Sequence, residues 1–176
     1  MRLIETPLAG AFVIEFDLHR DARGYFARTF DAKAFAELGL DGRVVQCSTS
    51  FNARAGTLRG MHYQASPHGE AKLVRCTCGA MYDVIVDLRP DSRTYCKWVG
   101  VELAAHEPRQ LFVPVGLAHG FETQQPDTEV HYQLSQPYVS EAARGVRWDD
   151  PAFAIEWPAE PRVISQRDRE YADFSP

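Results

Sequence analysis

The chain has 176 residues, of which 45% are hydrophobic, and this is enough apolar surface for a folded core rather than a disordered chain. Its length is typical of one domain, so we expect a single domain over residues 1–176. The formal net charge of −5 and the lack of a stripe of Lys and Arg argue against nucleic acid as a partner.

The first apolar run, Leu8 to Phe16, contains Glu15 and is too short to cross a membrane or to act as a signal peptide. We therefore expect a cytoplasmic protein. A short helix is predicted at Ala32 to Leu38, because Asp31 can cap its first turn and Gly39 can end it.

Short β-rich runs separated by turn residues dominate the rest of the chain. This spacing is typical of an antiparallel sandwich or barrel. The predicted strands are Val44 to Phe51, Thr57 to Tyr63, Lys72 to Cys78, Ala80 to Leu88, Trp98 to Leu103, Gln110 to Val115 and Glu129 to Leu134. Another helical turn or two is expected after Tyr138. The tail from Pro158 should pack back on the body through its scattered apolar residues.

The four cysteines are Cys47, Cys76, Cys78 and Cys96, and three of them fall in strand-like apolar runs. They are predicted to be reduced core thiols. Cys76 and Cys78 should share one face of a strand, but they lack the second pair of ligands that a tetrahedral zinc site needs.

The segment from Arg59 to Gln64 places an arginine and a histidine beside a glycine in one predicted strand. In a regular strand Arg59 and His62 would point to opposite faces. Both can line one pocket only if Gly60 permits a bulge or bend. Taken alone, His62 is more simply interpreted as a hydrogen-bonded structural histidine.

Three further side chains stand out in later strands. Lys72 begins an apolar strand, where its ammonium is either solvated or meets an anion inside. His119 follows a Pro and a Gly that shape the approach to its strand. Alternation puts Tyr132 inside and His131 on the other face, although a buried tyrosine is more often structural.

Two short charged segments look unremarkable alone. They are Arg23 to Phe26 and Ser165 to Asp168, and surface salt bridges would explain both.

Taken together and in order, these segments resemble the dTDP-4-dehydrorhamnose 3,5-epimerase family, whose small jelly-roll domains form dimers. The resemblance covers nearly the whole chain. Its motifs are Asp21 to Phe26, Leu58 to Gln64, Lys72 to Arg75, Asp83 to Arg89, Ala118 to Phe121, Trp148 to Pro151 and Ile155 to Pro158.

The resemblance implies a mainly β, cupin-type antiparallel jelly roll with one or two short helices. It implies an isomerase that inverts carbon 3, carbon 5 or both in a dTDP-4-keto-6-deoxyhexose, as in rhamnose-type deoxysugar biosynthesis. His62 matches the proton-abstracting base, Tyr132 the acid on the opposite side of the sugar, and Asp168 the carboxylate paired with the base. Lys72 would suit the enolate oxygen. Substrate contacts are implied for Arg23, Phe26, Arg28, Gln46, Ser48, Arg59, Lys72, His119, Tyr138 and Arg167, with Tyr138 stacking on the nucleotide base.

No cofactor and no metal are expected. The segment from Pro114 to His119 is similar to the second half of a metal-cupin motif, but His62 is followed by Tyr63 and Gln64 rather than by further ligands. The resemblance also implies a homodimer in which N-terminal strand residues such as Arg23 and Phe26 reach the neighbouring site.

The chain departs from the family pattern at substrate contacts. The family commonly has Glu at Arg28, Asp-Asn at Cys47-Ser48, and Glu at Ala143. The change at Arg28 reverses a charge, which leaves the nucleotide and the sugar open. The alternatives are a mono-epimerase or ketoisomerase that acts on a GDP- or CDP-linked 4-keto sugar, and a non-catalytic sugar-binding cupin.

Overall fold

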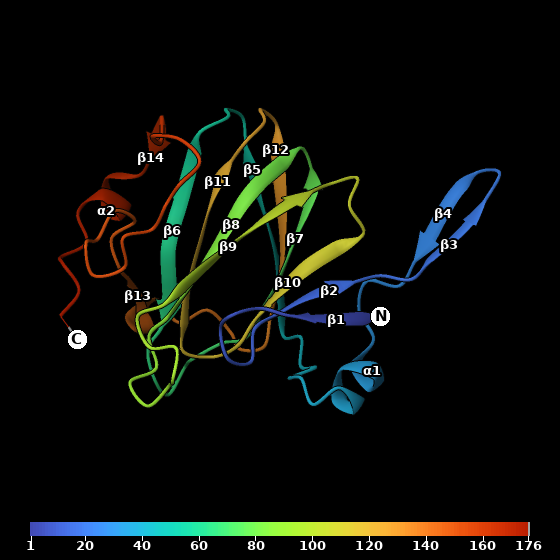
Figure 1. The fold of residues 1–176 in the computed structure, drawn as a ribbon, viewed down its shortest axis with the longest axis horizontal. Coiled ribbons are helices and arrows are strands. Elements are labelled where there is room, and N and C mark those ends of the chain that lie inside the picture. The colour runs from blue at the N-terminus through green and yellow to red at the C-terminus, as the bar shows by residue number, and fades with distance from the viewer. Residues whose placement is uncertain (176) are drawn as a thin grey trace.

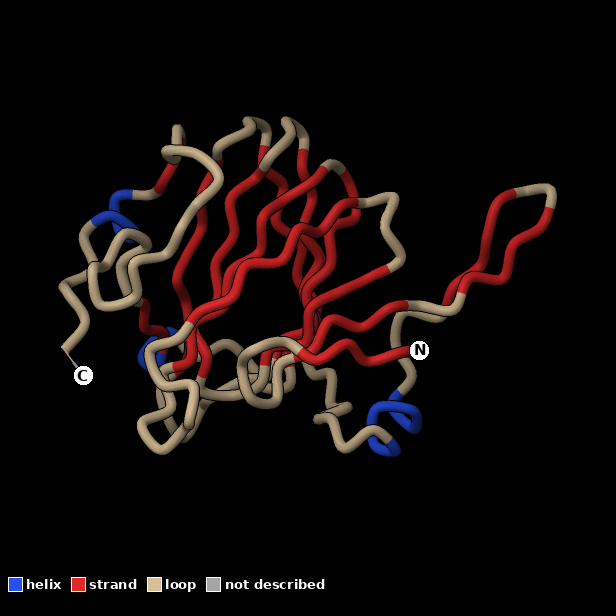
Figure 2. Tube along the Cα trace, viewed as in Figure 1, coloured by secondary structure: helices blue, strands red, loops and turns tan. Residues whose placement is uncertain are grey.

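A computed structural model describes residues 1–175 (Figure 1). Within this range the strands form two six-stranded sheets that pack face to face, and a two-stranded hairpin that projects from the body (Figure 1, Figure 2). The first sheet has the order β1 (Arg2–Glu5), β2 (Phe12–Glu15), β10 (Arg109–Val113), β7 (Lys72–Cys78), β12 (Thr128–Leu134) and β5 (Gln46–Asn52).

The second sheet has the order β13 (Ala143–Gly145), β6 (Thr57–Gln64), β11 (Leu117–Thr123), β8 (Ala80–Asp87) and β9 (Trp98–Ala104), with β14 (Val163–Ile164) also on β6. Among the described strands only the β14–β6 pair is parallel. The hairpin joins β3 (Leu18–Asp21) to β4 (Gly24–Ala27). The predicted antiparallel sandwich is therefore confirmed.

The helices are short. Helix α1 (Ala32–Glu37) begins where the side chain of Asp31 accepts hydrogen bonds from the backbone N–H groups of Lys33 and Ala34, which confirms the predicted cap. A 3-10 helix (Ser140–Ala142) supplies the turn expected after Tyr138, and α2 (Gln166–Arg169) was not predicted. None of the described helices is long and apolar enough to cross a membrane.

The main core lies between the two sheets. Val74 and Leu111 of the first sheet pack against Met81, Ile85 and Phe121 of the second, all at most 1% exposed. Burial of each such side chain contributes about 1.5 to 3 kcal/mol. Successive side chains in these strands therefore point alternately toward the opposite sheet and away from it, which explains the pattern that predicted the strands.

The C-terminal segment covers the outer face of the second sheet. Val84 and Val86 of β8 lie under Phe153, Trp157 and Phe174, so β8 is buried on both sides. The backbone N–H of Phe174 donates to the buried carboxylate of Asp150, 2.6 Å away. The expectation that the tail packs on the body is confirmed.

The cysteine prediction is only partly right. All four thiols are free, but only Cys76 is buried, whereas Cys47 and Cys78 are exposed. A bulge opposite Glu129 and Val130 shifts the register of β7. Cys76 and Cys78 therefore do not share a face as a regular strand would require. Burial raises the pKa of the Cys76 thiol to about 11.

The pairing of β6 with β11 contains a bulge. His119 pairs with His62, but Phe121 pairs with Arg59, so β6 holds one extra residue at this point. Gly60 lies there with a φ of +147°, which L side chains rarely adopt. A Cβ on Gly60 would lie 2.5 Å from the Cα of Gly120. The bulge that the sequence required at Gly60 is therefore confirmed.

The close approach of Gly60 and Gly120 leads to a stability prediction for Gly120→Ala. The added methyl would meet the carbonyl oxygen of Arg59 at 2.8 Å and the Cα of Gly60 at 2.9 Å. These backbone atoms cannot move without disturbing the strand pairing. We therefore expect chemical denaturation to show a free energy of unfolding about 1 to 3 kcal/mol lower than that of wild type. Gly24→Ala meets no atom within 4 Å, so its cost of about 1 to 3 kcal/mol should come only from its φ of +130°, which L side chains rarely adopt. Equal stability of Gly120→Ala and wild type would contradict this account.

Candidate functional site

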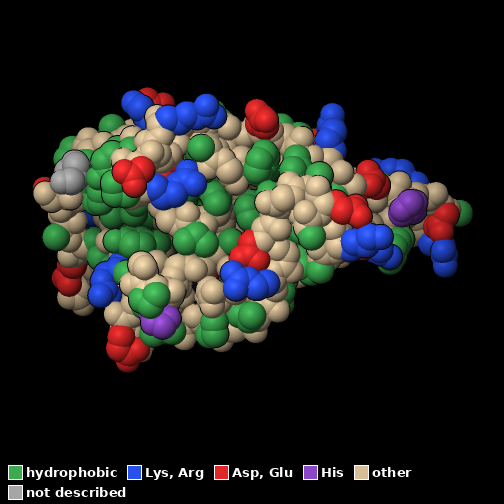
Figure 3. All heavy atoms as spheres, turned by 90° about the horizontal axis from the view of Figure 1, so that it is seen from below, with side chains coloured by type: hydrophobic (Ala, Val, Ile, Leu, Met, Phe, Trp, Pro, Cys, Tyr) green, Lys and Arg blue, Asp and Glu red, His purple; other side chains and the backbone are tan. Residues whose placement is uncertain are grey.

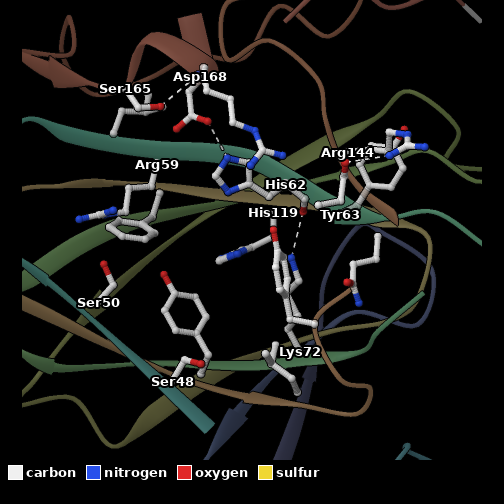
Figure 4. A pocket seen from close by; sticks show the side chains of 18 of the residues that line it. Ser48, Ser50, Arg59, His62, Tyr63, Lys72, His119, Arg144, Ser165 and Asp168 are labelled. Atoms are coloured by element: carbon white, nitrogen blue, oxygen red, sulfur yellow. Dashed lines mark hydrogen bonds and ion pairs between the residues drawn. The ribbon is translucent and has the colours of Figure 1, made fainter. Parts of the chain in front are cut away.

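A cavity of about 700 Å³ opens between the two sheets. This volume suits a small-molecule ligand. Figure 4 shows its polar side chains converging from both sheets and from the C-terminal segment. The structure brings nine of the predicted site residues to this cavity, namely Ser48, Arg59, His62, Lys72, His119, Tyr132, Tyr138, Arg167 and Asp168.

His62 and Asp168 form a hydrogen-bonded pair at one wall. The Nε2 atom of His62 lies 2.7 Å from Oδ1 of Asp168 (Figure 4). Helix α2 holds the carboxylate in place, because Ser165 caps the helix by accepting a hydrogen bond from the backbone N–H of Asp168. Asp168 is only 4% exposed, so its interpretation as part of a surface salt bridge is wrong. The segment from Ser165 turns Asp168 inward.

Burial by itself would raise the pKa of Asp168. The hydrogen bonds to its carboxylate from His62 and from the backbone N–H of Gly60 outweigh burial and lower this pKa below the usual value. Asp168 is therefore a carboxylate at neutral pH. It favours the tautomer of His62 in which Nε2 carries the hydrogen and Nδ1 has a free lone pair.

The bulge in β6 gives Arg59 access to the same cavity as His62. Its Nε donates to the side-chain oxygen of Asn52, 2.8 Å away, and Asn52 is itself buried. This contact orients the guanidinium beside the cavity, where it can bind an anion.

Lys72 is a buried cation on the opposite sheet. Its Nζ donates to the carbonyl oxygen of His62 at 3.0 Å (Figure 4). The same atom lies 3.3 Å from Oε1 of Glu70. Burial lowers the pKa of Lys72 from its usual value, and the negative charges of Glu70 and Asp83 oppose this effect. The sequence left a solvated lysine open, and the structure places Lys72 inside.

Tyr132 and His119 line the cavity between these groups. Tyr132 belongs to β12 of the first sheet and faces inward as its alternation predicted. Its ring meets that of His119 edge to face, with centroids 6.1 Å apart. Burial, and after it the charge of Asp83, raises the pKa of Tyr132 far above its usual value. The phenol therefore keeps its proton and can donate it.

His119 has a carboxylate partner of its own. Its Nε2 lies 2.6 Å from Oδ1 of Asp83, which is fully buried. This bond fixes the imidazole against β8 and leaves its other ring nitrogen available. Across residues 1–175, no three His, Cys, Asp or Glu side chains gather in a way that could hold a metal ion.

The rim of the cavity combines cations with an exposed aromatic ring. Tyr138 is 59% exposed, and its backbone N–H donates to Oε1 of Gln46 at 2.5 Å. Gln46 thus supports Tyr138 without lining the cavity itself. The guanidinium of Arg167 lies over the ring of Tyr171, 5.9 Å from its centroid. Such a rim suits an aromatic base and a phosphate chain.

The three remaining predicted residues lie away from this cavity. Arg23 pairs with Asp21 and Phe26 is 66% exposed, both on the projecting hairpin. Figure 3 shows this hairpin extending from the body with charged side chains along it. Arg28 pairs with Asp31 at the start of α1. One copy of the chain does not bring these residues to its own cavity.

Sequence reasoning missed several lining residues. The ones with polar side chains include Ser50, Tyr63, Glu70, Arg144 and Ser165. Alternation from Ser48 would have found Ser50, since both lie on one face of β5. Glu70 lies in a loop and carries no periodic signal, although it precedes Lys72 by two residues.

Comparisons with known proteins agree with this geometry. The family profile described as dTDP-4-dehydrorhamnose 3,5-epimerase matches residues 5–175. A dTDP-4-dehydrorhamnose 3,5-epimerase from Sinorhizobium fredii is 47% identical over 149 residues, which cover 84% of this chain and 76% of that protein.

Two solved structures are similar over almost the whole chain. The dTDP-4-dehydrorhamnose 3,5-epimerase from Bacillus anthracis, with TDP and PPi bound, has a TM-score of 0.95 and 41% identity, covering 98% of this chain and 99% of that one. A 3'-monoepimerase from Streptomyces bikiniensis in complex with dTDP-quinovose has a TM-score of 0.88 and 30% identity, covering 96% and 85%.

The family profile matches residues 5–175, and this range contains all the residues that line the cavity. They also confirm the expected cupin-type jelly roll. The chain therefore belongs to the dTDP-4-dehydrorhamnose 3,5-epimerase family of isomerases.

Proposed function

We propose that this protein inverts carbon 3 and carbon 5 of a dTDP-linked 4-keto-6-deoxyhexose, in deoxysugar biosynthesis. One observation carries the proposal: His62 and Tyr132 belong to opposite sheets and line the same cavity. A base on one side of a sugar and an acid on the other are what inversion at a carbon requires.

The reaction begins with the ketone at carbon 4, which acidifies the hydrogens on carbons 3 and 5. The ring nitrogen of His62 that does not face Asp168 takes one of these protons, and the electrons of the broken C–H bond pass into an enolate. The nearby carboxylate of Asp168 stabilises the imidazolium that forms.

Lys72 and Tyr132 complete the inversion. The ammonium of Lys72 donates a hydrogen bond to the enolate oxygen, where charge develops. Tyr132 then gives a proton to the opposite face of the carbon, which restores the ketone with inverted configuration. His62 then loses its proton to solvent and Tyr132 regains one from solvent. Each inversion therefore replaces one carbon-bound hydrogen with a hydrogen that comes from solvent.

The remaining cavity residues would bind the nucleotide part. Arg59 and Arg167 suit the diphosphate, because guanidinium groups bind phosphate through paired hydrogen bonds. Tyr138 suits stacking on the base, and Ser48 and His119 suit hydroxyl groups. The TDP and PPi in the Bacillus anthracis structure support a thymidine nucleotide.

A homodimer accounts for the residues that lie outside the cavity. Tyr25 and Phe26 are 53% and 66% exposed on the hairpin, and β5 is an edge strand that pairs only with β12 among the described strands. Both features favour association with a second copy. We propose that the hairpin brings Arg23 and Phe26 to the cavity of the neighbouring subunit.

A mono-epimerase is the second candidate, because the similar protein from Streptomyces bikiniensis is a 3'-monoepimerase. The substitutions Arg28 and Cys47-Ser48 lie at family substrate contacts, and Ser48 lines the cavity. The two candidates share the base, the acid and the enolate.

Solvent exchange distinguishes these reactions. With a dTDP-4-keto-6-deoxyhexose in deuterated water, we expect proton NMR to show loss of the signals from both carbon 3 and carbon 5, and a doubly inverted product. Exchange at one carbon alone would establish the mono-epimerase. Exchange at neither carbon would contradict epimerisation of this substrate, and GDP- and CDP-linked sugars would then be assayed in the same way.

Substitution of Tyr132 separates proton removal from inversion. In Tyr132→Phe, His62 can still remove a proton and return it to the same face, so we expect exchange to continue while inversion falls by about 10²- to 10⁴-fold. His62→Asn should lose both. Tyr82→Phe removes a phenol outside the cavity and should match wild type. Wild-type inversion by Tyr132→Phe would remove Tyr132 from the mechanism.

The dimer has its own measurement. Light scattering at working concentration should give a mass near twice the 19.8 kDa of one chain. Phe26→Asp on the hairpin should reduce turnover even though Phe26 does not line its own cavity. A mass of 19.8 kDa at all concentrations would contradict the shared site.

A further inference from the structure

A buried acid beside the cavity has no part in the reaction described so far. Glu70 lies in the loop before β7, and its side chain is 7% exposed. Its Oε1 lies 3.3 Å from Nζ of Lys72. Its Oε2 is buried and accepts no hydrogen bond from any described residue. A carboxylate rarely stays buried with an unpaired oxygen, because the loss of water is costly.

The contacts of Lys72 explain where this acid acts. An ammonium has three N–H donors. One donates to the carbonyl oxygen of His62 on β6, and a second faces Glu70 in the loop before β7. These two anchors lie on different parts of the fold and fix the position of Nζ. The third donor remains for the cavity that Lys72 lines.

Charge balance around Lys72 depends on few groups. Burial disfavours the charged form of the lysine, and Glu70 opposes burial more strongly than Asp83 does. Asp83 already has His119 as a partner, 2.6 Å away. The titratable side chains that line the cavity with Lys72 are Glu70, Arg59, His62, Tyr63, His119, Tyr132, Tyr138, Arg144, Arg167 and Asp168. Of these, Glu70 alone forms an ion pair with it.

We propose that Glu70 is a positioning residue, which keeps Lys72 charged and directs its free N–H toward the oxygen that becomes negative during the reaction. The proposal rests on the proposed function in one respect, the role of Lys72 at the enolate oxygen. The ion pair itself is independent of any substrate. Glu70 acts through Lys72, so its effect should follow the charge of the lysine.

The charge of Lys72 can be measured without substrate. The chain has three lysines, Lys33, Lys72 and Lys97, so labelling with ¹³C-lysine gives a spectrum of three side chains. Lys33→Arg and Lys97→Arg assign the Lys72 signal. Its titration is compared in wild type and Glu70→Gln, which keeps the shape of the side chain and removes the charge. Circular dichroism defines the pH range in which each variant stays folded.

We expect the pKa of Lys72 to fall by about 1 or more in Glu70→Gln, the usual effect of losing an opposite charge at this distance. Glu122→Gln is the matched control, because Glu122 is also buried with an unpaired oxygen but lies outside the cavity. It should leave the titration unchanged. An unchanged Lys72 titration in Glu70→Gln, or an equal change in Glu122→Gln, would overturn the proposal.

Activity provides the second arm. With less charge on Lys72, kcat of Glu70→Gln should decline at a lower pH than in wild type as pH rises. KM should change less than kcat, because the oxygen is fully charged only along the reaction path. Glu70→Asp keeps the charge and should restore part of kcat. A pH profile identical to that of wild type would contradict the proposal. A different result would refute the proposed reaction and leave the ion pair standing. In that case the wild-type enzyme would show no deuterium exchange at carbon 3 or carbon 5, while the Lys72 titration still depended on Glu70.

Discussion

At the bulge between the paired strands β6 and β11 the two backbones approach so closely that neither Gly60 nor Gly120 has room for a side chain. This approach permits the extra residue in β6, which turns Arg59 and His62 toward one cavity. It also places His119 beside His62 across the strand pair. The shared access of Arg59 and His62 to the cavity therefore depends on this one bulge, because a regular strand would have put the two side chains on opposite faces.

The two sheets contribute different chemistry to the cavity. The second sheet supplies two histidines, each bonded to a buried carboxylate, but the side chain of His62 is 41% exposed and that of His119 only 5%. His62 can thus exchange a proton with solvent, whereas His119 is held in place. The first sheet supplies Lys72, whose Nζ donates to the backbone oxygen of His62, and Tyr132, whose ring contacts that of His119. The groups that the proposed reaction needs therefore come from both sheets and line one cavity.

Much of this could be predicted from sequence because it follows from alternation and turn chemistry. The alternation of apolar residues around Tyr132 correctly predicted that its side chain faces inward. The bulge at Gly60 was predicted because Arg59 and His62 could not otherwise line one pocket. Only the family resemblance implied the inward position of Asp168, and no local pattern did, because α2 is a single turn without periodicity and its orientation depends on tertiary packing. The hairpin of β3 and β4 is exposed on both faces, so it shows no apolar alternation. The exposure of Cys78 follows from the bulge in β7, which could not be predicted because the extra residue there is Thr77 and not a glycine.

The bond between His62 and Asp168 joins residues 106 positions apart in the chain. Contacts of such long range form after the local pairings, because the entropy of closing a loop grows with its length. A chain whose C-terminal segment has not yet docked would carry His62 without its carboxylate partner. It would also expose the outer face of β8, where Val84 and Val86 lie. Docking of the C-terminal segment therefore has two effects, because it brings Asp168 to His62 and covers apolar surface that would otherwise favour aggregation.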